Sequence, residues 1–283
     1  MNSKKLLNLY ALKWNPFIPD LPTEALLFTP KIESFAWRIE NLVQEGGFAL
    51  ITGDPGTGKS VALRSLAERL KAIRDVAFGV ITRPQSKIVD FYRELGEVFQ
   101  VRLSSNNRYG GFKLLREKWK AYVESNLLRP VILVDEAQET PIEVLSEIRL
   151  LSSANFDSTR FLTVILCGDS RLPDLFQHKS LISLGTRIRT RLNLDYASKD
   201  ELRELLLHAM SKAGNSKLLS DELVDTLVDH AAGNFRTMMN MAAEILGAGT
   251  AKEGVPLDEK LYLEVFQRTP ARIASKSKLK EPR

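Results

Sequence analysis

The segment 53–60 has the residue types and the spacing of a phosphate-binding loop. It matches the pattern G-x-x-x-x-G-K-S/T at every position and reads Gly53, Asp54, Pro55, Gly56, Thr57, Gly58, Lys59, Ser60. Glycines let successive backbone N–H groups turn toward a phosphate, and the start of a following helix adds to that attraction. We expect Lys59 to reach the β- and γ-phosphates of ATP, the Ser60 hydroxyl to hold Mg²⁺, and Val61 to lie against the nucleotide. An accidental match arises roughly once in a hundred chains of this length.

Two acidic residues directly follow an apolar run at 131–134. Many buried strands end in acids, so this pattern alone is weak. After a phosphate-binding loop it predicts the second half of the site, with Asp135 as a Mg²⁺ ligand and Glu136 as the base that deprotonates the attacking water. The alternative for Glu136 is an acid that the N-terminus of a helix favours.

Two further segments carry residues that could complete such a site. Asp169 follows the apolar run 161–167 and could contact the γ-phosphate or the water, although an acid in a loop is otherwise unremarkable. Arginines stand at the alternate positions Arg187, Arg189 and Arg191. Arginine is the group that a neighbouring subunit supplies to stabilise a transferring phosphoryl group. A surface strip of ion pairs is the alternative.

Apolar runs and helical patterns alternate through the first two thirds of the chain. The runs typical of buried parallel strands lie at 48–52, 76–82, 131–134, 161–167 and 192–194. This alternation predicts an α/β fold with a parallel sheet of about five strands and right-handed crossovers. The four helical patterns that follow, with no strand pattern, predict a small all-helical domain.

These patterns suggest four regions: an irregular, proline-rich segment at 1–30, an α/β nucleotide-binding core at 31–196, a helical lid at 197–268 and a basic tail at 269–283. Of the net charge of +5, the tail from Ala271 onward supplies +4, because five basic residues stand there against one acid. The rest is close to neutral, so bulk charge does not indicate a DNA-binding face. The tail is either a solvated terminus or an arm for nucleic acid or a partner protein.

Composition argues against membrane insertion and secretion. The longest apolar run, 161–168, is far shorter than the roughly 20 residues that cross a bilayer, and the N-terminal residues lack the pattern of a signal peptide. Cys167 is the single cysteine and cannot form an intrachain disulfide. We therefore expect a cytoplasmic protein with no membrane partner.

With these pieces in order, the chain resembles the AAA+ ATPases of the ExeA-like group, which includes the transposon target-selection ATPases TnsC and TniB. The likeness runs from about residue 8 to 267 and comprises Asn15-Pro16-Phe17 and the segments GDPGTGKS, VDEAQ, GDSRLPDLF, RIRTRL and GNFRTMMN. It implies an AAA+ core with a helical lid and ATP hydrolysis with Mg²⁺. It also implies nucleotide contacts by Asn15 and Phe17, an arginine finger within Arg187–Arg191 and a lid sensor at Arg236. Many AAA+ proteins have Asn or Thr where Asp169 stands.

The resemblance further implies ATP-dependent assembly into rings or helical filaments on duplex DNA, linking a target-selection protein to a transposase. Such a protein would be associated with a bacterial nucleoid. The DNA contacts would follow the second strand, at Arg83 and Lys87, and then at Ser105, Asn107 and Arg108; ordinary exposed loops are the alternative. An ExeA-like secretion or envelope ATPase and an initiator- or clamp-loader-like DNA remodeller remain as other functions.

Overall fold

The computed structural model describes residues 3–102, 107–125, 127–155 and 158–266. The chain divides into two compact units. One unit runs from Phe28 to Asp195, and the other combines Met1–Leu27 with Tyr196–Arg283. Within the described ranges, no helix is both long and apolar enough to cross a membrane.

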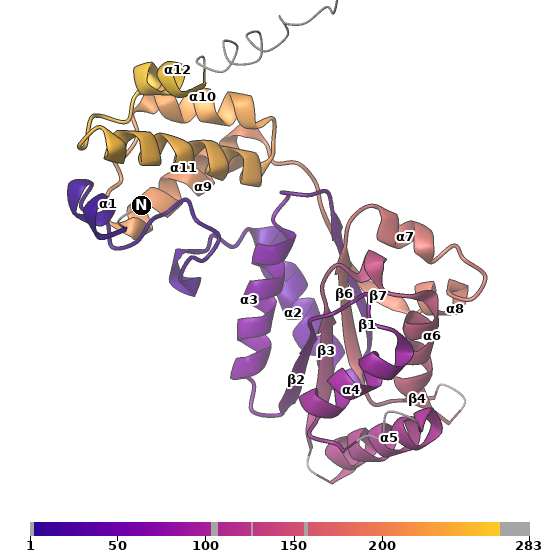
Figure 1. Ribbon diagram of the computed structural model, residues 1–283. Helices are drawn as coiled ribbons and strands as arrows, with labels where there is room; N and C mark the ends of the chain where they lie inside the picture. Colours follow the sequence, from indigo (N-terminus) through magenta and orange to yellow (C-terminus); the bar gives the residue numbers. More distant parts are fainter. Residues whose placement is uncertain (1–2, 103–106, 126, 156–157, 267–283) are drawn as a thin grey trace, which may run out of the picture. The chain divides into compact units, whose positions relative to one another are not determined.

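The first unit is built on a five-stranded, all-parallel sheet in the order β2-β3-β6-β1-β7 (Figure 1). The strands are β1 (Gly47–Gly53), β2 (Val76–Ile81), β3 (Arg129–Val134), β6 (Thr163–Gly168) and β7 (Ile188–Leu194). A short antiparallel pair, β4 (Ser153–Ala154) and β5 (Thr159–Arg160), precedes β6. The α/β class and the parallel sheet expected from the sequence are thus confirmed. The strand at 192–194 is longer than expected and includes Arg189 and Arg191.

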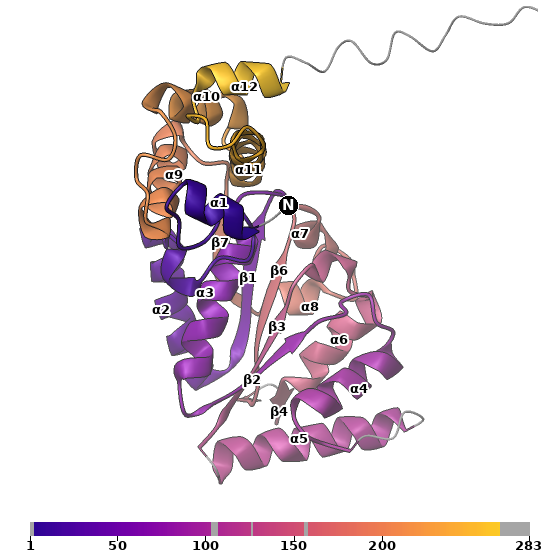
Figure 2. The same cartoon turned by 60° about the vertical axis from the view of Figure 1, so that its left-hand side comes forward.

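Helices cover both faces of this sheet (Figures 1 and 2). One face is covered by α2 (Pro30–Glu45) and α3 (Lys59–Ala72), and the other by α4 (Ile88–Val98), α5 (Arg108–Glu124) and α6 (Ile142–Leu151). The short helices α7 (Arg171–Leu175) and α8 (Ile182–Gly185) follow β6. Successive strand residues point to opposite faces, so Leu50 packs with the α4–α6 layer and Ile51 with α2 and α3. Burial on both faces explains why the strands read as continuous apolar runs.

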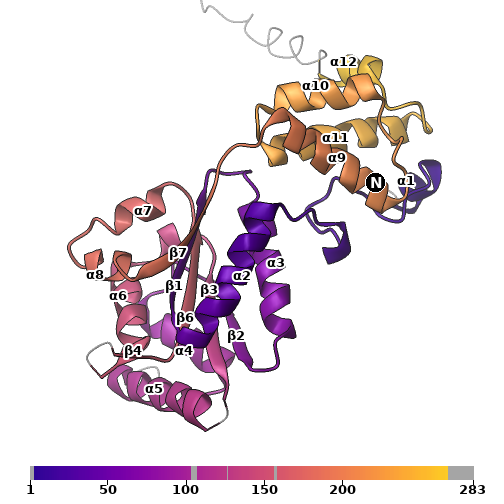
Figure 3. The same ribbon diagram turned by 180° about the vertical axis from the view of Figure 1, so that it is seen from behind.

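The second unit is all-helical (Figure 3). It contains α1 (Ser3–Leu9), the 3-10 turn η1 (Thr23–Ala25), α9 (Lys199–Ala213), α10 (Asp221–Ala231), α11 (Phe235–Ala251) and α12 (Glu259–Phe266). Side-chain caps start three of these helices: Ser198 forms a capping box with Glu201, and Ser220 and Asn234 each accept one backbone N–H. These caps are visible in the sequence, and the boundaries of the helices follow them.

The N-terminal segment differs from the irregular structure that its prolines suggest. Residues 3–9 form α1, and Leu6 and Leu12 are buried in the core of the helical unit. The backbone N–H of Lys13 donates to Ala213 over 2.8 Å, and the Asn215 amide donates to the carbonyl of Tyr10 over 2.9 Å. A seven-residue helix is unstable alone. Its partners lie about two hundred residues away in the sequence, so local patterns do not reveal it.

Candidate functional site

The phosphate-binding loop joins β1 to α3, as the sequence predicts. Gly56 and Gly58 have φ values of 88° and 99°, in the left-handed region that favours glycine. Lys59 begins α3, is buried, and donates from Nζ to the carbonyls of Gly53 over 2.6 Å and Asp54 over 3.0 Å. The ammonium group is therefore held against the loop itself, where a phosphate cradled by the loop would meet it.

Close packing explains the glycine at the start of the loop. A Cβ added to Gly53 would lie 2.4 Å from the carbonyl oxygen of Leu194 and 2.6 Å from Oγ1 of Thr57. The Thr57 hydroxyl donates to the carbonyl of Asp54 over 2.9 Å and closes the turn. The loop shape is thus set by the end of β7 and by a side chain of the loop itself.

The residues expected to hold Mg²⁺ lie on the same side of the sheet. Val131 and Leu133 pack toward α3, and Asp135 continues this alternation just beyond the end of β3. Ser60, in the first turn of α3, is exposed, and Asp135 is half-buried. A hydroxyl and a carboxylate are the hard oxygen ligands that Mg²⁺ takes together with phosphates. These residues fit the metal, which would neutralise charge on the phosphates when bound.

Cys167 lies beside this metal position. Burial raises the pKa of its thiol, and the neighbouring Asp135 carboxylate raises it further. The thiol therefore stays protonated and neutral at physiological pH. A neutral thiol next to the proposed Mg²⁺ ligand adds no competing charge.

Glu136 is exposed at the end of β3, with a φ of 51°. Its carboxylate accepts a hydrogen bond of 2.5 Å from Nε2 of Gln138, and Oε1 of Gln138 accepts the backbone N–H of Asp169 over 3.3 Å. Gln138 thus joins the ends of β3 and β6. Sequence reasoning did not assign Gln138 a role, although a polar residue two positions after the expected base was the available indication.

Asp169 has a different environment from the one that the sequence suggests. Arg171 donates to both of its carboxylate oxygens and also donates to Glu139 over 2.9 Å. This arginine lowers the pKa of Asp169 through hydrogen bonds and charge. Both oxygens of Asp169 are engaged, so the group at this position with donors for a phosphate or for water is the exposed Arg171. No sequence pattern assigned a role to Arg171.

The three arginines of the 187–191 segment have different surroundings. Arg189 donates to Glu45 at 2.5 Å, and Arg191 donates to the carbonyl of Gly185 at 3.2 Å. Arg187 lies just before β7, is half-buried, and lines a surface hollow. The structure therefore distinguishes Arg187 from the two arginines on the strand.

Arg187 and the phosphate-binding loop lie at opposite ends of the parallel strands. Gly53, Asp135 and Asp169 are at or just after the carboxyl ends of their strands, whereas Arg187 precedes the amino end of β7. The strands β1 and β7 are parallel, with Phe48 opposite Ile188 and Gly53 opposite Leu194. The amino and carboxyl ends of these strands are therefore separated by the strand length. Six residues span roughly 20 Å.

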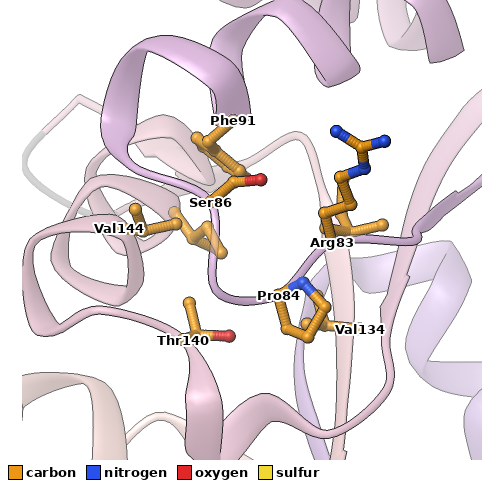
Figure 4. A pocket seen from close by; sticks show the side chains of 9 residues that line it. Arg83, Pro84, Ser86, Phe91, Val134, Thr140 and Val144 are labelled. Carbon is orange, nitrogen blue, oxygen red and sulfur yellow. The ribbon is translucent and has the colours of Figure 1, made fainter.

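Of the residues expected to contact DNA, Arg83 and Lys87 lie in the exposed loop between β2 and α4. Figure 4 shows Pro84 turned toward Val134, while the guanidinium group of Arg83 points away from both residues. No carboxylate of the described chain lies within ion-pair distance of either cation. Both cations are thus available to an external anion.

Arg108, expected to contact DNA from the second loop, pairs with an acid of its own chain. Its guanidinium group forms two hydrogen bonds with Glu147, whose side chain is only 4% exposed. The Tyr92 hydroxyl donates to the same carboxylate over 2.5 Å. Arg108 is thus the charge partner of a buried acid, and its contact with DNA stays a prediction. Asn107 caps α5 by accepting the N–H of Gly110, and Ser105 lies outside the described residues.

Three nucleotide-binding candidates belong to the helical unit. Phe17 is 3% exposed in the core of that unit, and its N–H donates to the Asn15 side chain over 3.0 Å. These contacts give Phe17 a packing role in the helical unit, and the nucleotide contact expected from the sequence stays a prediction. Arg236 is exposed in the first turn of α11, where the helix dipole disfavours a cation by about 0.3–1 kcal/mol. Its presence there favours a role outside helix stability.

Comparison with known proteins agrees with this geometry. Residues 42–176 match the family described as AAA domain. General secretion pathway protein A of Aeromonas hydrophila is 30% identical over 185 residues, which cover 64% of this chain and 33% of that protein. The chain therefore spans about a third of this relative's length.

Solved structures with the same fold come from proteins of much lower identity. Cdc6p of Pyrobaculum aerophilum has a TM-score of 0.68 at 17% identity, covering 88% of this chain and 70% of its own. Drosophila ORC bound to DNA has a TM-score of 0.66 at 16% identity, covering 93% and 65%. The fold is thus the AAA+ P-loop fold. The AAA domain match over residues 42–176 agrees with this fold.

Proposed function

We propose that this AAA-domain ATPase is an ATP-dependent regulator of DNA transposition, which assembles with further copies of itself on duplex DNA. In this role it links a target-selection protein to a transposase. ATP binding drives assembly, and hydrolysis, with Glu136 as the base, reverses it.

The observation that carries self-assembly is the separation between Arg187 and the phosphate-binding loop. A fully extended arginine side chain is much shorter than the roughly 20 Å between the amino and carboxyl ends of the strands. Arg187 therefore does not reach the nucleotide of its own subunit. This separation supports the proposal that Arg187 acts on the nucleotide of a second copy, as an arginine finger supplied by a neighbouring subunit does.

The DNA-binding part of the proposal is supported by two observations. Arg83 and Lys87 are exposed cations without carboxylate partners in the described chain. A solved structure with the same fold is Drosophila ORC bound to DNA. One subunit contributes few phosphate contacts, so binding would depend on many copies aligned along one duplex.

Secretion is the second candidate, and its support is the sequence identity to General secretion pathway protein A. An initiator- or clamp-loader-like DNA remodelling role is supported only by the likeness of fold to Cdc6p and to ORC bound to DNA. Sedimentation with plasmid DNA separates these functions from secretion, because the secretion role predicts no ATP-dependent cosedimentation. Stimulation of a transposase, rather than DNA melting, then separates the regulator from the initiator.

The test of self-assembly is the dependence of ATP hydrolysis on protein concentration. We expect specific activity to rise with concentration, and Arg187→Ala to abolish hydrolysis while each subunit still binds ATP. Mixing Arg187→Ala with Lys59→Ala should restore part of the activity, because one variant supplies the nucleotide and the other the arginine. Arg189→Ala is the matched control, since Arg189 is paired with Glu45 in its own subunit. Constant specific activity without rescue in mixtures would refute the proposal.

A further inference from the structure

A hollow of about 510 Å³ opens on the surface of the α/β unit between α5, α6, β4 and the start of β7. The residues that line it are Phe112, Arg116, Arg149, Leu150, Ser153, Ala154, Asn155 and Arg187. In Figures 1 and 3, β4 and α5 lie at the end of the sheet away from α7, the helix that begins after the carboxyl end of β6. The hollow is therefore far from the phosphate-binding loop of the same subunit.

Among the described residues that line this hollow, three are arginines and none is acidic. In the described ranges, no carboxylate lies within ion-pair distance of Arg116 or Arg149. The Nε group of Arg149 is buried and has no hydrogen-bond partner there. Buried polar groups in proteins are almost always hydrogen-bonded, so this guanidinium group keeps one unsatisfied donor.

Arg116 is held in place by contacts that leave part of its guanidinium group available. Its NH2 group donates to the carbonyl of Ser153 over 2.7 Å, and its guanidinium carbon lies 5.1 Å from the centre of the Phe112 ring. A stacked and hydrogen-bonded arginine loses little entropy when it binds an anion. The geometry is thus preorganised for an anion on the open side.

We propose that this hollow, lined by Arg116, Arg149 and Arg187, is a phosphate-binding site. Planar guanidinium forks match the tetrahedral oxygens of a phosphate and form paired, charge-assisted hydrogen bonds with them. Phosphate also offers enough acceptors to serve more than one arginine. The phosphate is either the terminal group of a nucleotide held by a second copy of this chain or a backbone phosphate of nucleic acid. The first source rests on the function proposed above, and the second does not.

The direct test uses inorganic pyrophosphate as the probe and Lys59→Ala protein as the background, so that the phosphate-binding loop competes weakly. Calorimetry should show pyrophosphate binding that weakens at least tenfold when Arg116→Gln and Arg149→Gln are added. Lys113→Gln is the control, because Lys113 is an exposed cation on the same helix α5, outside the hollow. Arg149→Lys should restore only part of the affinity, since lysine keeps the charge without the fork. Equal pyrophosphate affinity in the glutamine variants and in the control would overturn the proposal.

Two further measurements on otherwise wild-type protein identify the source of the phosphate. If it belongs to a nucleotide of a second copy, the double glutamine variant loses hydrolysis and regains it when mixed with Lys59→Ala. If it belongs to nucleic acid, the variant loses affinity for duplex DNA and its salt dependence becomes shallower, while hydrolysis is kept. The glutamine variants could lose pyrophosphate binding while Arg187→Ala hydrolyses ATP normally and independently of its concentration. This result would support a phosphate-binding site in the hollow and refute self-assembly. Unchanged pyrophosphate binding in the glutamine variants, together with loss of hydrolysis in Arg187→Ala, would refute the phosphate-binding site in the hollow but not self-assembly.

Discussion

The side chain of Gln138 donates a hydrogen bond to the carboxylate of Glu136, with 2.5 Å between the two atoms. The same amide group accepts the backbone N–H of Asp169 through its oxygen. The carboxylate expected to deprotonate water is therefore held by a residue that is itself anchored to the neighbouring strand β6. A general base is effective only when its position is fixed within hydrogen-bonding reach of the proton it removes.

The first prediction separates the base from the residue that positions it. Glu136→Gln should keep ATP affinity and lower kcat by about 10²–10⁴, the usual contribution of general base catalysis. Gln138→Ala should lower kcat less, because the carboxylate remains but is no longer held. Phosphate release and calorimetry measure the two quantities. Parental hydrolysis in Glu136→Gln would show that another group is the base.

The second prediction concerns the buried lysine of the phosphate-binding loop. Lys59→Ala removes the cation that lies against this loop, and charge-assisted hydrogen bonds contribute about 1.5–3 kcal/mol each. We expect ATP affinity to fall by about tenfold to a hundredfold for one such bond. Isothermal titration with ATP and Mg²⁺ gives the value. Lys71→Ala, an exposed lysine on the same helix α3, is the control and should bind ATP normally.

The third prediction concerns the loop after β2. Arg83→Ala with Lys87→Ala should weaken ATP-dependent binding to duplex DNA of any sequence, and the slope of log affinity against log salt should become shallower by about one unit per lost phosphate contact. Fluorescence anisotropy across a salt series measures this slope. Deleting residues 271–283 is the comparison, since these residues carry most of the net charge. Should only the deletion abolish binding, the loop is not the DNA contact.

The fourth prediction is about stability rather than DNA. Arg108→Ala leaves the buried Glu147 carboxylate with Tyr92 as its remaining side-chain partner, and an unsatisfied buried acceptor costs about 1–3 kcal/mol. We expect the free energy of unfolding to decrease by an amount within this range. Arg108 is itself partly exposed, so solvent screens part of the effect. Urea denaturation tests it, with Lys113→Ala as the control that should change it by less than about 0.5 kcal/mol. Equal stability of the two variants would contradict the role assigned to this ion pair.

The fifth prediction is a pH dependence of the helical unit. Burial lowers the pKa of His208 on α9 below its ordinary value, and its Nε2 has no partner in the described chain. The neutral form is therefore favoured in the folded protein. Its stabilising effect is complete above pH 6.5 and is lost as the pH falls through the lower pKa of the folded state. His208→Gln should reduce this loss, which thermal denaturation between pH 7.5 and 5 can measure; an unchanged pH profile would exclude His208 as the cause.

Local sequence was enough to predict a nucleotide site in this protein. The loop at 53–60 and the acids at 135–136 were identifiable because each pattern is contiguous and directly follows an apolar strand. The parallel sheet was predictable for the same reason, since strands buried on both faces are continuous apolar runs. The caps at Ser198 and Asn234 likewise depend only on nearby residues.

Tertiary structure alone decided the partners of the charged side chains. An arginine has the same residue type whether it pairs with buried Glu147, as Arg108 does, or lines a surface hollow together with two other arginines, as Arg149 does. Helix α1 was also unpredictable, because its stability comes from packing against α11, far along the chain. Electrostatic interactions and burial depend on distance in space, whereas sequence patterns report only neighbours along the chain. For that reason the sequence made all three arginines of the 187–191 segment equal candidates for the arginine finger. Only the fold shows that Arg187 has surroundings different from those of Arg189 and Arg191.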